Sequence, residues 1–258
     1  MKNSTKRGAE GPVDEACASF VGRPAAELLT VRDGGTAEQN YDRALHRHLE
    51  GMPLKEIGFF VNSKRLEMIE QLVGQELRRK GSEILNVACG PFALEFYLQL
   101  RGAHITSFDR ESRLAGLHGE LLSSGLISDS EFHVSDVHEF AAAKRYDAVI
   151  INDLFYTKHI DFYALICKYA GYVKPGGLLY FDIQDERAGP VWRAFGKDAE
   201  YRRYDLARVS KTLKDCGLDV TSVTPALEIK GGLDRVLRKG LWYTAGLANS
   251  FVFVARKT

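Results

Sequence analysis

The sequence predicts an α/β protein built on a mostly parallel sheet, and two features of the chain carry this prediction. From about residue 63 onward, short apolar runs alternate with stretches of helical periodicity, which is the pattern of strands joined by crossover helices. The connections between successive strands over residues 84–183 are about as long as a helix, which favours parallel pairing with right-handed crossovers. The last two strands, 218–223 and 250–255, are the exception, and one of them is expected to run antiparallel.

The N-terminal part of the chain is expected to lie outside this sheet. Residues 1–15 are polar and are predicted to form a disordered tail, and residues 16–58 are predicted to form a helical extension or lid. Within it, a helix is expected over 39–50, with Tyr41, Ala44 and Leu45 on its apolar face. A second helix over 63–79 opens the main domain, which is expected to span 59–258.

The main domain is predicted to alternate strand and helix. The expected strands cover 84–88, 104–108, 131–135, 147–151, 178–183, 218–223 and 250–255, and the expected helices cover 92–99, 112–123, 162–172 and 205–216. Lys174, Pro175, Gly176 and Gly177 predict a sharp turn before the fifth strand.

Composition excludes several classes of protein. The 258 residues carry 35 basic and 34 acidic side chains, so no global field favours nucleic acid as a partner. No apolar run approaches the roughly 18–20 residues that cross a bilayer, and the basic N-terminus has no apolar segment of a secretory signal behind it. Cys17, Cys89, Cys167 and Cys216 are scattered, so neither a zinc site nor a disulfide framework is expected. A cytoplasmic location follows as the expectation, and no metal is predicted.

Polar residues follow four successive strands of the predicted sheet. The first strand runs into the small-residue turn Ala88-Cys89-Gly90, the second ends at Asp109, the third at Asp136, and the fourth at Asn152 and Asp153. In a sheet of this kind, ligands bind beyond the carboxyl ends of the strands. Asp109 comes 19 residues after Gly90, the distance at which an acidic side chain accepts the hydroxyls of a ribose. Asp136 is placed to accept from an exocyclic adenine amine.

Over residues 60–258 these features resemble the class I S-adenosylmethionine-dependent methyltransferases. The turn Asn86-Val87-Ala88-Cys89-Gly90-Pro91-Phe92 occupies the place of the family's Asp-x-Gly-x-Gly-like turn, and Asp109 and Asp136 match its ribose-binding and adenine-binding acids. Tyr146–Ile150 and Val173–Leu179 resemble its fourth strand and the turn before its fifth strand. The resemblance implies a Rossmann-like three-layer sandwich with a seven-stranded sheet whose last strand is reversed.

S-adenosylmethionine is the cofactor that this resemblance implies. The cofactor-binding residues predicted on this basis are Asn86, Ala88, Cys89, Gly90, Asp109, Arg110, Asp136, Val137, Asn152 and Leu154. The turn departs from the family pattern, because Asn86 replaces the acid, Ala88 the first glycine and Phe92 the last. Phe92 is expected to point away from the cofactor, and Cys89 to contribute its backbone N–H rather than its thiol.

The loop after the fourth strand holds the candidates for catalysis. Imidazole titrates near neutral pH, so His159 is predicted to be a general base, with Asp153 orienting it or acting itself. Phe155 and Tyr156 are expected to wall the acceptor or the adenine, and Tyr41 and His46 to face the site from the extension. The predicted reaction is methyl transfer to a small-molecule, glycan-type or lipid-type acceptor, at oxygen rather than nitrogen.

Two alternative functions and the role of one variable segment stay open at this stage. Ala88-x-Gly90-x-x-Ala93 with Asp109 is a loose dinucleotide fingerprint, which is typical of an NAD(P)-dependent oxidoreductase. The altered turn also permits a cofactor-binding protein without transferase activity. The variable segment 225–249 contains a basic amphipathic stretch at 230–243, which predicts either weak contact with a membrane surface, a grip on an anionic acceptor, or a solvated helix on the sheet edge.

Overall fold

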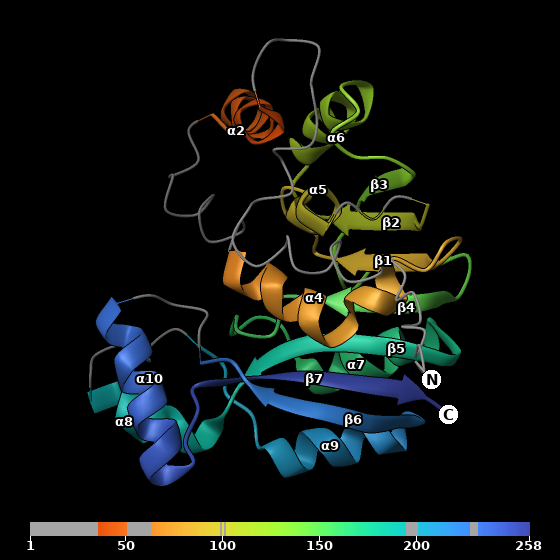
Figure 1. Ribbon diagram of the computed structural model, residues 1–258. Helices are drawn as coiled ribbons and strands as arrows, with labels where there is room; N and C mark the ends of the chain where they lie inside the picture. The colour runs from red at the N-terminus through yellow and green to blue at the C-terminus, as the bar shows by residue number, and fades with distance from the viewer. Residues whose placement is uncertain (1–35, 51–62, 99, 101, 195–200, 228–231) are drawn as a thin grey trace, which may run out of the picture.

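The protein is built around one twisted sheet of seven strands. The computed structural model describes residues 36–50, 63–98, 100, 102–194, 201–227 and 232–258, so the predicted tail at 1–15 and most of the extension at 16–58 lie outside the described residues. The strands are β1 (Glu83–Val87), β2 (His104–Asp109), β3 (Ser130–Val134), β4 (Tyr146–Ile151), β5 (Val173–Gln184), β6 (Leu218–Pro225) and β7 (Ser250–Lys257). Their order across the sheet is β3-β2-β1-β4-β5-β7-β6 (Figure 1).

The strand directions confirm a mostly parallel sheet with a reversed last strand. β1 pairs in parallel with both β2 and β4, and the parallel ladder continues from β2 to β3 and from β4 to β5. β7 runs antiparallel to β5 and β6, between which it lies. The central strands β1 and β4 bury almost every side chain, as strands covered on both faces must.

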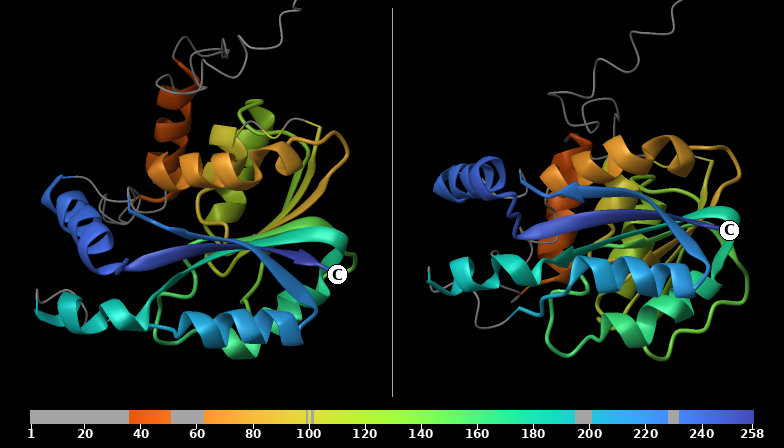
Figure 2. Two further views of the ribbon diagram at one scale, coloured as in Figure 1. Left: turned by 60° about the horizontal axis from the view of Figure 1, so that its bottom comes forward. Right: turned by 90° about the horizontal axis from the view of Figure 1, so that it is seen from below.

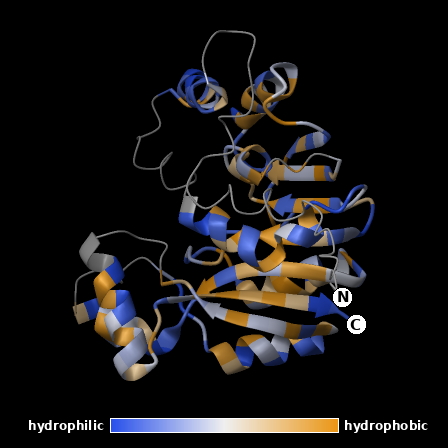
Figure 3. Ribbon diagram, viewed as in Figure 1, coloured by the Kyte–Doolittle hydropathy of each residue, from blue (hydrophilic) through white to orange (hydrophobic). Residues whose placement is uncertain are grey.

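Helices cover both faces of the sheet and complete three layers (Figure 2). The helices are α2 (Ala37–His48), α4 (Ser63–Leu77), α5 (Ala93–Leu98), α6 (Leu114–Ser123), α7 (Phe162–Gly171), α8 (Gly189–Ala194), α9 (Leu206–Asp215) and α10 (Gly232–Ala245), with a 3₁₀ turn at Glu186–Ala188. α4 and α5 pack on one face through Leu66, Ile69 and Leu94, and α7 and α9 pack on the other through Ile166 and Val209. Apolar residues concentrate on the strands between these layers, while the outer helix faces are polar (Figure 3).

The first described helix, α2, confirms the helix predicted over 39–50. Thr36 caps it with a capping box, in which its hydroxyl accepts from the N–H of Gln39 and the Gln39 side chain accepts in return. Its apolar face, including Tyr41, Ala44 and Leu45, is buried against α5 and α6. The part of the extension that the structure describes is therefore fixed to the edge of the domain beside α6 (Figure 1).

The predicted turn at 174–177 is a bulge inside β5 rather than a turn before it. Val173 already pairs with Tyr146, and the register then shifts so that the next pair is Leu178 with Ala148. Glycine is required here, because a Cβ atom on Gly177 would lie 2.8 Å from the carbonyl oxygen of Asp147.

The prediction that the cysteines form no disulfide is wrong. Cys167 on α7 and Cys216 after α9 are joined by a disulfide, with 5.2 Å between their Cα atoms. The two residues are 49 positions apart in the sequence. They meet because α7 and α9 lie side by side on the same face of the sheet. This pairing depends on helix packing, which cysteine spacing alone does not reveal.

The segment 225–249 contains α10, which lies, like α8, at the end of the sheet toward which β5 points (Figures 1 and 2). α10 exposes Val236 and Tyr243 and buries Arg238, whose guanidinium lies 5.0 Å from the centre of the Trp192 ring. The surface contact predicted for 230–243 stays a prediction. Among the described residues, the structure contains no helix long and apolar enough to cross a membrane.

Candidate functional site

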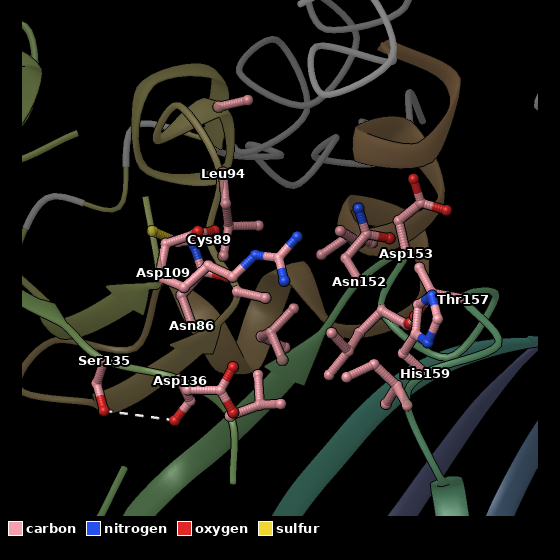
Figure 4. A pocket seen from close by; sticks show the side chains of 18 of the residues that line it. Asn86, Cys89, Leu94, Asp109, Ser135, Asp136, Asn152, Asp153, Thr157 and His159 are labelled. Carbon is pink, nitrogen blue, oxygen red and sulfur yellow. Dashed lines mark hydrogen bonds between the residues drawn. The ribbon is translucent and has the colours of Figure 1, made fainter. Parts of the chain in front are cut away.

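A pocket of about 320 Å³ lies at the carboxyl ends of β1, β2, β3 and β4 (Figure 4). Nine of the ten predicted cofactor-binding residues line it, together with both predicted catalytic residues. The lining comprises Leu66, Ile69, Asn86, Ala88, Cys89, Ala93, Leu94, Asp109, Arg110, Ser135, Asp136, Val137, Ile150, Asn152, Asp153, Leu154, Thr157, His159 and Ile160. The polar strand ends thus converge on one pocket, as the parallel topology predicts.

The turn after β1 adopts left-handed backbone where the sequence lacks glycine. Ala88 and Phe92 have φ values of 50° and 62°, and Gly90 between them has 57°. A residue with a Cβ atom pays roughly 1–2 kcal/mol for this conformation. Phe92 is fully buried, and its ring packs on Phe132 and His118, away from the pocket. The bulky residue therefore serves the core between the turn and β3, as expected for its place at the helix start.

Backbone N–H groups of this turn are used within the protein. The N–H of Cys89 donates to the carbonyl oxygen of Phe108 at 3.0 Å, which corrects the prediction that it is offered to a ligand. The N–H of Cys89 makes this bond because the hydrogen-bond ladder between β1 and β2 continues past Val87, the last residue of β1. The N–H of Gly90, the one predicted residue that does not line the pocket, donates to Oδ2 of Asp109 at 3.1 Å.

The two carboxylates at the ends of β2 and β3 are held by backbone donors. Asp109 accepts from Gly90 through one oxygen and from the N–H of Glu111 through the other, at 3.1 Å. Asp136 accepts from the N–H of His138 at 2.9 Å. An ionised carboxylate has about four acceptor positions, so each side chain is oriented and still has capacity for a ligand's donors.

Asn86 forms a buried pair with Glu95, a residue that the sequence did not single out. The Asn86 amide donates to Oε1 of Glu95 at 3.1 Å, and the hydroxyl of Ser107 donates to the same oxygen. Oε2 of Glu95 is buried with no hydrogen-bond partner. Burial raises the pKa of Glu95, and the hydrogen bonds from Ser107 and Asn86 offset only part of this effect. Asn86 stands where the family pattern has an acid, and Glu95 on α5 brings a carboxyl group next to it.

Replacing Glu95 with glutamine is expected to remove a pH-dependent loss of stability. A carboxyl group whose pKa is raised in the folded state is favoured below its unfolded pKa, and the protein loses this stability as the pH rises through the folded pKa. Glutamine keeps an acceptor oxygen for Asn86 and Ser107 but never ionises. Relative to Glu95→Gln, the wild type should therefore become less stable as the pH rises above the ordinary glutamate pKa of about 4.3 and through the raised pKa of the folded protein, by roughly 1.4 kcal/mol for each unit of pKa shift.

Denaturant unfolding of both proteins at several pH values measures this difference. A constant difference in stability across the range would show that Glu95 is not the group whose ionisation is penalised.

The Cys89 thiol is unsuited to nucleophilic chemistry. Burial raises its pKa, and the charges of Glu95 and Asp109 raise it further. A thiol is reactive as the thiolate, so this environment keeps Cys89 inert.

The loop after β4 brings Asn152, Asp153 and His159 to the pocket. Oδ1 of Asn152 is buried and has no hydrogen-bond partner among the described residues, so it presents an acceptor to the pocket. Asp153 forms an ion pair with Arg65 at 2.7 Å, and its carboxyl group is turned away from the imidazole of His159 (Figure 4). His159 itself is exposed at the pocket mouth. The predicted pairing of Asp153 with His159 is thus replaced by a pairing with α4.

The four residues predicted to face the acceptor do not line the pocket. The hydroxyl of Tyr41 donates to the carbonyl oxygen of Pro91 at 2.7 Å, and its ring stacks on Phe96 within the core. His46 is exposed near the end of α2. Phe155 packs between α7 and the sheet, and Tyr156 is buried with its hydroxyl on Asp182. Phe155 and Tyr156 belong to the loop that lines the pocket, but their side chains point into the core beneath this loop.

Several lining residues were not predicted. Leu66 and Ile69 come from α4, and Thr157 and Ile160 from the loop after β4. The apolar stripe of α4 packs on the sheet through Leu66 and Ile69, and the same two residues also form part of the pocket wall. Helical periodicity in the sequence identifies an apolar stripe, but it does not show which residues of the stripe also border a pocket.

Comparison with known proteins agrees with this architecture. No known family profile matches the chain. The ubiquinone biosynthesis O-methyltransferase of Aromatoleum aromaticum is 30% identical over 136 residues, which cover 51% of this chain and 53% of that protein. The chain therefore matches about half the length of this curated relative.

Three solved structures have the same fold. Magnesium protoporphyrin IX methyltransferase from Synechocystis PCC 6803, solved with bound S-adenosylhomocysteine, matches 86% of this chain and 95% of its own, with a TM-score of 0.57 and 14% identity. A putative sarcosine dimethylglycine methyltransferase from Galdieria sulphuraria matches 75% of this chain and 84% of its own (TM-score 0.56, 14% identity). A methyltransferase from Clostridium acetobutylicum matches 85% and 98% (TM-score 0.55, 13% identity). The predicted resemblance to class I methyltransferases is confirmed for the fold.

Proposed function

We propose that this chain, which has the fold of the class I S-adenosylmethionine-dependent methyltransferases, binds S-adenosylmethionine and transfers its methyl group to a small acceptor. The observation that carries the proposal is the convergence of Asp109, Asp136 and Asn152, from the ends of three different strands, on one pocket beside the turn after β1. The partial similarity to an O-methyltransferase supports the same activity.

The residues present fit this cofactor. Asp109 and Asp136 are oriented acceptors, suited to the ribose hydroxyls and the adenine amine. Arg110, Val137 and Leu154 lie beside them and supply walls for the adenine. The buried, unpartnered oxygen of Asn152 fits a donor of the amino-acid part, since an orphaned acceptor is costly unless a ligand satisfies it.

Bound S-adenosylmethionine would supply a methyl group activated by its positively charged sulfur. The protein then has to align the acceptor with that group and exclude water, which contributes several kcal/mol without a covalent catalyst. We assign to His159, which lines the pocket, the removal of a proton from an acceptor hydroxyl, a contribution of about 10²–10⁴-fold. Asp153 is engaged with Arg65, so the proposed role of His159 does not depend on Asp153.

An oxygen acceptor suits this site better than an amine. A neutral amine needs only orientation, whereas a hydroxyl gains from a base, and His159 offers one. Leu66, Ile69 and Ile160 give the pocket apolar walls, which favour a small-molecule or lipid-type acceptor with an apolar body.

Formation of S-adenosylhomocysteine with a panel of hydroxyl and amine acceptors tests the proposal. We expect turnover with a phenolic or alcoholic acceptor, and we expect His159→Gln to slow it by about 10²–10⁴-fold while leaving cofactor affinity unchanged. Cofactor binding without product from any acceptor would instead favour a non-catalytic binding protein.

A further inference from the structure

One buried carboxylate outside the pocket, that of Asp182 on β5, accepts hydrogen bonds from three directions. Its Oδ1 accepts from the backbone N–H of Asp153 at 2.7 Å. Its Oδ2 accepts from the hydroxyl of Tyr156 at 2.6 Å and from Nη1 of Arg65 at 2.8 Å. The side chain is 1% exposed. Asp182 thus connects α4, β5 and the loop after β4.

Arg65 joins the two carboxylates of this cluster. Its Nη1 lies 2.7 Å from Oδ1 of Asp153 and 2.8 Å from Oδ2 of Asp182, and its side chain is 7% exposed. Burial alone would lower the pKa of Arg65, but Tyr156, Asp182 and Asp153 raise it overall. The guanidinium therefore stays charged between them. It also lies 5.1 Å from the centre of the Tyr156 ring.

The cluster acts on a strained part of the pocket wall. Asp153 has a φ of 61°, a left-handed conformation that costs a residue with a Cβ atom roughly 1–2 kcal/mol. Such a conformation persists only where the surroundings determine it. Here the N–H of Asp153 is held by Asp182 and its carboxylate by Arg65, so both ends of the residue are fixed. Its neighbours Asn152 and Leu154 line the pocket, and Figure 4 shows Asn152 next to Asp153.

We propose that Asp182 and Arg65 are positioning residues of the ligand pocket. They hold Asp153 in its left-handed conformation and thereby set the direction of the Asn152 side chain, whose buried oxygen faces the pocket. The inference rests on the proposed function for the identity of the ligand. It also assigns Asp153 to this positioning cluster rather than to proton transfer.

The test compares Asp182→Asn with a matched control, Asp147→Asn. Asp147 also accepts from a backbone N–H, that of Glu83, and pairs with Arg79, but it lies at the opposite end of β4. Two quantities are measured: the affinity for S-adenosylhomocysteine by calorimetry and the hydrogen exchange of the Asp153 amide by NMR. We expect Asp182→Asn to weaken binding at least 10-fold and to accelerate exchange at Asp153 by a similar factor. Asp147→Asn should change neither by more than about 2-fold.

A second variant, Arg65→Lys, covers the case in which Asp182→Asn does not fold. Nη1 of Arg65 makes both contacts, and the shorter lysine side chain does not bring its Nζ to the same position between the two carboxylates, although it keeps the charge. It should weaken S-adenosylhomocysteine binding by about 3- to 10-fold. Unchanged affinity and unchanged Asp153 exchange in the folded variants would overturn the inference. Failure of the wild type to bind would instead overturn the proposed function, and the exchange measurement would still decide whether Asp182 holds the loop.

Discussion

Replacing Asp109 with alanine is expected to weaken S-adenosylmethionine binding by about 10²–10⁴-fold. The variant would lose the two charge-assisted hydrogen bonds that we propose between this carboxylate and the ribose hydroxyls, worth roughly 1.5–3 kcal/mol each. The substitution also releases the N–H of Gly90, which Asp109 holds at 3.1 Å, so the turn after β1 loses one of its fixed points. Asp109 is half-buried at the end of its strand, and the fold is expected to survive. Calorimetric titration measures the affinity, and circular dichroism checks the fold.

Glu111→Ala is the matched control for this substitution. Glu111 lies two residues away and pairs with Arg113 at 2.8 Å, but it does not line the pocket. Its backbone N–H, which bonds Asp109, is kept in the variant. Cofactor affinity should therefore remain that of the wild type. Equal affinities of Asp109→Ala and Glu111→Ala would remove Asp109 from the ribose role.

Replacing Phe92 with glycine is expected to destabilise the protein by about 3 kcal/mol, although glycine suits its backbone better. Removing a buried phenylalanine side chain costs about 3–5 kcal/mol, and relief of the left-handed strain returns only roughly 1–2 kcal/mol. The ring is fully buried against Phe132 and His118, so its loss leaves a cavity. Denaturant unfolding measures the change.

Ala88→Gly is the matched comparison within the same turn. Ala88 has a φ of 50°, but its methyl group is only half-buried beside the pocket. Relief of strain is offset in part by the greater freedom of glycine in the unfolded chain, so stability should rise by up to about 1 kcal/mol. If both variants lose similar stability, packing rather than backbone conformation governs the turn at both positions.

The fold and the cofactor side of the site could be predicted from sequence because they depend on local patterns. Apolar runs locate β1 to β5, and parallel strands bring their carboxyl ends to one edge, so Asp109, Asp136 and Asn152 converge without further information. The polar residue at the end of each strand can be identified directly from the sequence. The acceptor side was predicted less well, because the directions of Tyr41 and Tyr156 depend on which neighbours fill the core.

Residues that act through tertiary contacts carried weaker signals. Asp182 stands inside an otherwise apolar strand, and a charge in such a strand implies a buried partner, so this signal was available. Its partner Arg65 comes from a helix 117 residues earlier, and nothing in the sequence names it. The contacts of Glu95 and the Cys167–Cys216 disulfide were equally hard to predict, since each depends on how helices pack on the sheet.

Calorimetric titration of the wild-type protein measures directly which cofactor the pocket binds. The proposed pocket predicts that S-adenosylmethionine and S-adenosylhomocysteine each bind at one site per chain and displace one another, whereas NAD does not bind. If neither sulfur ligand binds at high micromolar concentration and NAD binds saturably instead, the proposed function is wrong and a dinucleotide oxidoreductase is favoured.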